Sequence, residues 1–156
     1  MTIRQIILDG RITEEKGRQF VSGQGLYNDG FTKILRIEPW GYASVPVAGS
    51  RGIAVPLGGN ADMAVFLGGE SGGHRPPGLP AGASALYDAN GNIIKCVGTG
   101  IVIDVAGRTI DITAGQWTLT GNATITGNVT IDGNLTCTGN GTFAGSVTDG
   151  DGDGGA

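Results

Sequence analysis

A six-residue repeat constrains the fold of this chain more than any other feature of its sequence. From residue 120 onward, five consecutive hexads read TGNATI, TGNVTI, DGNLTC, TGNGTF and AGSVTD. The second place of every hexad is a glycine: Gly121, Gly127, Gly133, Gly139 and Gly145. A short unit repeated in this way indicates an elongated structure in which each unit packs on its neighbours.

The repeat also alternates strictly between apolar and polar side chains. The odd positions carry the apolar residues Ala123, Ile125, Val129, Ile131, Leu135, Cys137, Phe143 and Val147, whereas the even positions are almost all Asn, Thr and Ser. Period-two alternation with many β-branched residues predicts β-strands that have one apolar face. A glycine every sixth residue predicts a bend there. We therefore expect very short strands whose odd positions form a core and whose glycines form the bends.

Strands this short bury too little surface to offset the entropy of ordering them, and they leave open edges. Two arrangements solve both problems. The chain can coil on itself as a solenoid, or three chains can wind around a threefold axis and share one core. Less regular alternation upstream extends the expected shaft to residues 97–148.

The first part of the chain has a different pattern, in which short apolar segments are separated by Gly, Asn and Asp. We expect strands at 4–8, 18–21, 33–37, 43–47, 52–57 and 61–67, and one helical turn at 13–16. So many strands in residues 1–73 favour a small OB-fold-like barrel. A connector rich in Pro and Gly and a hairpin with its turn at Asn90-Gly91 follow at 74–96. The fold class is therefore all-β.

Charge is distributed unevenly and excludes several functions. All 10 Lys and Arg residues lie at or before Arg108, and the net charge is −4. Without a basic surface to neutralise phosphates, nucleic acid is not an expected partner. Cys96 and Cys137 lack the spacing of a metal site, and we expect both to be buried, reduced thiols.

An acidic segment at 149–156 is the expected tip of the shaft. Asp149, Asp151 and Asp153 continue the odd parity, so three chains would place rings of carboxylates on a common axis. Oxygen ligands of this kind suit Ca²⁺ or Mg²⁺. The alternatives are a solvated acidic tail and a shaft capped by a separate tip protein.

Other candidate residues have simpler explanations. His74 is the one histidine in the chain and has no nucleophile partner in the sequence, so we expect it to pack or to form a hydrogen bond. Trp117 and Phe143 share the apolar parity and are expected in the core. The adjacent Glu14 and Glu15 point in different directions and do not make a carboxylate pair for glycoside hydrolysis. We therefore expect no catalytic residue.

Several motifs resemble the signature of the phage Mu-type baseplate assembly protein V family, which forms the central spike of contractile tails. These are HRPPGLPAG at 74–82, ALYD at 85–88, GYASVP at 41–46 and FLGGE at 66–70. The resemblance covers residues 40–148 and includes the hexad shaft. It implies a homotrimer with an OB-fold collar beneath a tail-tube hub protein and a C-terminal intertwined triple-stranded β-helix.

The resemblance also implies a function. Sheath contraction would drive the spike through the bacterial outer membrane, without any enzymatic activity. The protein would be assembled in the bacterial cytoplasm and would be part of the virion. Iron held by histidines at the tip, as in many relatives, is not supported, because His74 lies far upstream.

Two alternatives remain open. A trimeric fibre or adhesin stalk would have the same rod without the collar signature. A left-handed β-helix acyltransferase would also have hexads, but its pattern places the small residue one position earlier and requires a histidine near the coils. No histidine follows His74.

Overall fold

The computed structural model describes residues 3–148, except for the side chains of residues 61 and 62. The chain divides into two compact units, Met1–Ile112 and Thr113–Ala156. Every regular element in the described range is a β-strand, in agreement with the expected all-β class. No helix in this range is long and apolar enough to cross a membrane.

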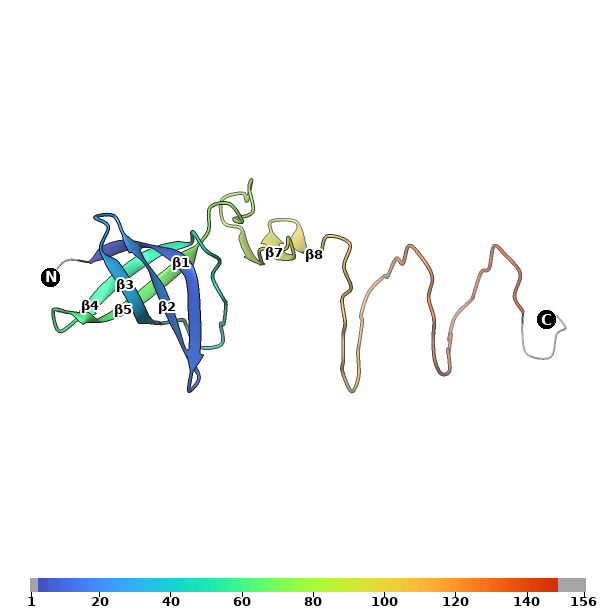
Figure 1. The fold of residues 1–156 in the computed structure, drawn as a ribbon. Coiled ribbons are helices and arrows are strands. Elements are labelled where there is room, and N and C mark those ends of the chain that lie inside the picture. Colours follow the sequence, from blue (N-terminus) through green and yellow to red (C-terminus); the bar gives the residue numbers. More distant parts are fainter. Residues whose placement is uncertain (1–2, 149–156) are drawn as a thin grey trace. The chain divides into compact units, whose positions relative to one another are not determined.

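Five strands of the first unit form a closed barrel (Figure 1). They are β1 (Arg4–Glu15), β2 (Arg18–Gly25), β3 (Gly30–Arg36), β4 (Arg51–Leu57) and β5 (Asn60–Glu70). The order around the barrel is β1-β2-β3-β5-β4, and β1 closes it by pairing with both β2 and β4. β3 and β5 pair in parallel, and the other pairs are antiparallel. The expected small OB-like barrel is thus present, and it has five strands.

The barrel core comes from alternate residues of these strands. Its members are Ile6, Leu8, Val21, Ile34, Ala54, Ala64 and Phe66. Phe66 is completely buried, and its ring lies against Gly52 on β4. A Cβ atom at Gly52 would lie 2.4 Å from Phe66 Cζ, so only glycine leaves room for this ring.

Two local predictions for this region were wrong. Residues 43–47 do not form a strand but belong to an irregular segment between β3 and β4. Residues 13–15 are not helical but complete β1, and a tight turn at Lys16-Gly17 leads into β2. Both residues of this turn have positive φ, 52° and 72°.

A separate three-stranded antiparallel sheet follows the barrel in the sequence. It consists of β6 (Ser84–Tyr87), β7 (Ile93–Val97) and β8 (Gly100–Asp104). The predicted hairpin is confirmed by the pairing of β6 with β7. Asp88 Oδ1 closes its turn by accepting hydrogen bonds from the backbone N–H groups of Asn90 and Asn92, at 2.8 and 3.0 Å.

The second unit consists of extended runs joined by bends (Figure 1, orange to red). A bend lies at each of the five hexad glycines. The first three, Gly121, Gly127 and Gly133, have φ values of 131°, 133° and 144°, which are unfavourable for residues with a side chain. In the single chain no atom would meet an added Cβ at any of the five, so the first three are explained by backbone conformation rather than by crowding.

Candidate functional site

The apolar row of the hexad repeat is uncovered in the single chain. Its large members are between 44 and 74% exposed: Ile125, Val129, Ile131, Leu135, Phe143 and Val147. Ala123 and Cys137 in the same row are exposed as well. So many exposed apolar side chains along one segment are typical of an interaction site, because their contact with water is unfavourable.

The backbone of the repeat makes few hydrogen bonds within its own chain; the Gly139 carbonyl accepts one from Cys137 Sγ at 3.3 Å. Within the described residues 109–148, no two backbone groups are hydrogen-bonded to each other and no strand pairs form. The structure therefore does not coil this segment into a solenoid. Backbone N–H and C=O groups that are removed from water require partners. Any partner that covers the apolar row must also satisfy these groups.

The polar side of the repeat is nearly uncharged. Its even positions are mostly Thr and Asn, with Asp132 as the single acidic residue between 120 and 148 and no Lys or Arg. Trp117 and Phe143, which were expected in the core, are 72 and 71% exposed in the single chain. They belong to the uncovered surface of the single chain.

Neither cysteine is buried in the single chain. Cys96 and Cys137 are free thiols and both are exposed, so the prediction of burial fails for one chain taken alone.

The expected tip carboxylates Asp149, Asp151 and Asp153 lie outside the described residues. Among the side chains that the structure describes, no three of His, Cys, Asp or Glu gather as a metal site would require.

His74 forms a hydrogen bond, which confirms its expected role. Its Nδ1 atom lies 2.9 Å from Ser71 Oγ, and its backbone N–H donates to the carbonyl of Ser71. The two residues thus form one local turn.

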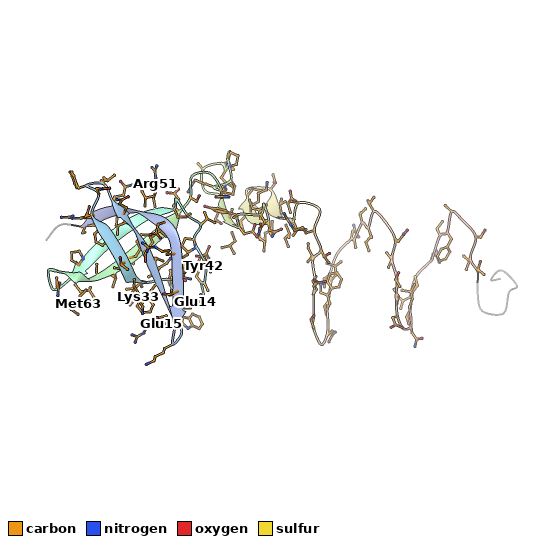
Figure 2. All side chains as sticks on the ribbon, in the orientation of Figure 1. Glu14, Glu15, Lys33, Tyr42, Arg51 and Met63 are labelled. Carbon is orange, nitrogen blue, oxygen red and sulfur yellow. The ribbon has the colours of Figure 1, made fainter. Side chains whose placement is uncertain are left out.

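Glu15 is paired with Lys33 Nζ at 2.6 Å on the barrel surface, next to Glu14 (Figure 2). These contacts are typical of surface structure rather than of a catalytic pair.

One important residue, Arg36, was missed by the sequence reasoning. Its side chain is only 6% exposed and is paired with Glu38 at 2.9 Å. It donates to Gln19 Oε1 at 2.8 Å and to the carbonyl and hydroxyl oxygens of Ser44 at 2.7 and 2.9 Å. It also donates to the carbonyl of Gly68. The sequence offered one sign that Arg36 is buried. It follows Ile34 by two residues, so both side chains lie on the interior face of β3.

The Arg36 network holds the irregular segment between β3 and β4 against the barrel. Ser44 donates from its backbone N–H and its hydroxyl to Glu38 Oε1, both at 2.9 Å. Side chains thus supply the hydrogen bonds that a neighbouring strand would otherwise provide. The segment projects Trp40, whose side chain is fully exposed.

Comparison with known protein families identifies the barrel. Residues 10–73 match the family model described as Bacteriophage Mu Gp45, N-terminal. No curated protein matches the chain. The match runs from within β1 past the end of β5, so it includes residues before 40, where the motifs gave no information, and ends before the HRPPGLPAG run. The match confirms the resemblance drawn from the motifs: residues 10–73 are similar to the N-terminal domain of Bacteriophage Mu Gp45, which is the baseplate assembly protein V family.

Proposed function

We propose that this protein is the central spike of a contractile tail baseplate, a homotrimer that punctures the bacterial outer membrane when the sheath contracts. One observation carries the proposal. A repeat with an exposed apolar row and an unpaired backbone follows a barrel of a phage baseplate family. The barrel would form the collar and the repeat would form the shaft.

Three chains suit the repeat better than one. The bends divide each chain into runs too short to form a core alone. Around a threefold axis, each run can pair along both edges with the other two chains and can direct its odd positions to the axis. An intertwined triple-stranded β-helix of this kind covers the apolar row and satisfies the backbone in one step.

The proposed function is mechanical. Bending such a shaft requires many interchain hydrogen bonds to break together, which makes it stiff. Its outer face of Thr and Asn carries no cation that could hold it to anionic lipid headgroups. The collar would bind a tail-tube hub protein. At the tip, a divalent cation or a separate tip protein would close the shaft. No enzymatic step is required.

The test uses contractile tails whose gene for this chain has been deleted and then supplied again. Tails carrying the wild-type chain are expected to release dye from loaded outer-membrane vesicles on contraction. Tails lacking the chain, or carrying Ile131→Asp, are expected to release little. Full release without the chain would contradict the proposal. Vesicle attachment that depends on the chain, with release that does not, would indicate a fibre or adhesin stalk instead.

A further inference from the structure

The third place of the hexad repeat holds an asparagine four times, in the same local setting but before a different residue each time. The four are Asn122, Asn128, Asn134 and Asn140, and they are followed by Ala123, Val129, Leu135 and Gly141. All four are exposed in the single chain, and each lies in an extended run directly after a bend. Asn140 differs from the other three because the next residue has no side chain.

The glycine at position 141 is explained by its neighbour in the apolar row. A Cβ atom at Gly141 would lie 3.2 Å from Cε2 and 3.5 Å from Cζ of the Phe143 ring, which is tighter than ordinary packing. The φ of Gly141 is not in the left-handed region, so the backbone conformation does not require glycine. The largest side chain of the row thus accounts for an Asn-Gly pair in the fourth hexad.

An Asn-Gly pair favours a reaction between the asparagine side chain and the backbone that follows it. The glycine nitrogen loses its proton to hydroxide and attacks the side-chain Cγ, the bond from Cγ to the amide nitrogen breaks, and ammonia leaves. Water then opens the succinimide ring on either side and gives aspartate or isoaspartate, so the net change is water in and ammonia out. A Cβ on the attacking residue hinders its approach, and glycine has none.

The structure leaves this attack open at Asn140. Neither its side chain nor the backbone N–H of Gly141 has a hydrogen-bond partner among residues 3–148, the range that the structure describes. The other Asn-Gly pair of the chain, Asn90-Gly91, is held in the hairpin turn. Asp88 accepts hydrogen bonds from the backbone N–H of Asn90 at 2.8 Å and from its Nδ2 atom at 3.4 Å.

We infer that Asn140 is a site of spontaneous modification by water in chains that have not assembled, and that assembly of the shaft protects it. The second part rests on the proposed trimer, in which pairing with another chain would occupy the Gly141 N–H and hold the backbone extended. Isoaspartate routes the backbone through the side-chain carbons, which lengthens it and disturbs the alternation from Phe143 onward. A chain left unassembled would thus lose the register that the shared core requires.

The test follows the four asparagines by peptide mass spectrometry while the full chain is incubated in mildly alkaline buffer. Ile131→Asp supplies separated chains, and the wild-type chain unfolded in guanidinium chloride is a second separated reference. In both, Asn140 should react about tenfold faster than the other three or more, a ratio that corresponds to ~1.4 kcal/mol in the activation barrier. Adding Gly141→Ala is the matched control. It gives residues 140–142 the sequence of residues 122–124 and should slow Asn140 to the rate of Asn122.

The outcomes separate this inference from the proposed function. Equal rates at the four asparagines of separated chains, or no effect of Gly141→Ala, overturn the site. In the wild-type trimer, Asn140 should react about tenfold more slowly than in separated chains. A trimer in which it reacts as fast overturns the protection and leaves the trimeric shaft intact. A monomeric wild-type chain contradicts the trimer and the protection together, and the order of its four rates still decides the site.

Discussion

Gly127 shows how a single residue carries the geometry of the repeat. Its φ of 133° lies in a region that only glycine adopts without cost, whereas the φ of Gly139 does not. Gly127→Ala should therefore destabilise each chain by about 1–3 kcal/mol. In a trimer, this cost would arise in each of the three chains. Gly139→Ala is the matched control, since both positions have open space around an added Cβ in the single chain. Thermal unfolding followed by circular dichroism should show the larger loss for Gly127→Ala, and equal losses would refute the backbone explanation.

Arg36 is the one charged residue among the buried residues that the structure describes. Arg36→Met should cost about 3–5 kcal/mol, because it leaves the mostly buried Glu38 carboxylate without its partner. Arg51→Met on the exposed surface of β4 is the control and should change the free energy of unfolding by less than about 0.5 kcal/mol. Urea unfolding of both variants measures the difference. A cost for Arg36→Met as small as that of the control would mean that the network is not structural.

Asp29 makes the barrel sensitive to acid. The hydrogen bond from the Arg4 side chain lowers the pKa of the Asp29 carboxyl below its ordinary value of 3.8. The pKa of Asp29 is lower in the folded state than in the unfolded state, so the Arg4–Asp29 pair stabilises the fold above pH 3.8. This stabilisation is lost as the pH falls through the pKa of the folded state. Asp29→Asn should lower the urea midpoint at pH 7, and its difference from wild type should shrink at pH 3. An unchanged difference would show that ionisation of Asp29 does not contribute.

At the scale of the element, the parity of the repeat is open to a direct test. Ile131→Asp would place three carboxylates on the dry axis of a trimer, where unpaired charge is strongly destabilising. Thr130→Asp puts the same charge one residue away, on the face expected to meet water. Size exclusion with light scattering should show loss of the trimer for Ile131→Asp and its retention for Thr130→Asp. If the two substitutions act alike, the assignment of inner and outer faces is wrong.

The elements differ in how far they could be predicted from the sequence. The barrel strands and the β6–β7 hairpin follow from local patterns, namely alternating apolar residues and turn signals at Asn and Gly. Residues 43–47 have the same alternation, yet Val45 is 67% exposed and the segment is irregular. Its partners are side chains of Arg36 and Glu38, which are not visible in a local pattern. The hexads encode bends and parity, but their pattern does not distinguish a core built by one chain from a core shared between chains.

At the scale of the molecule, the two units divide the work of the proposed spike. The barrel closes its own sheet and buries its own core within one chain. The repeat does neither within one chain. In the proposed spike, the collar would fold within each chain. The shaft would form only when three chains have assembled correctly.

The native mass of the full chain, measured by light scattering after size exclusion, tests the trimeric shaft most directly. Three interwound chains predict a mass of three times 15.7 kDa. A mass of 15.7 kDa would mean that one chain covers its own apolar row. It would contradict the intertwined shaft and favour a self-coiled solenoid, the arrangement that the acyltransferase alternative requires.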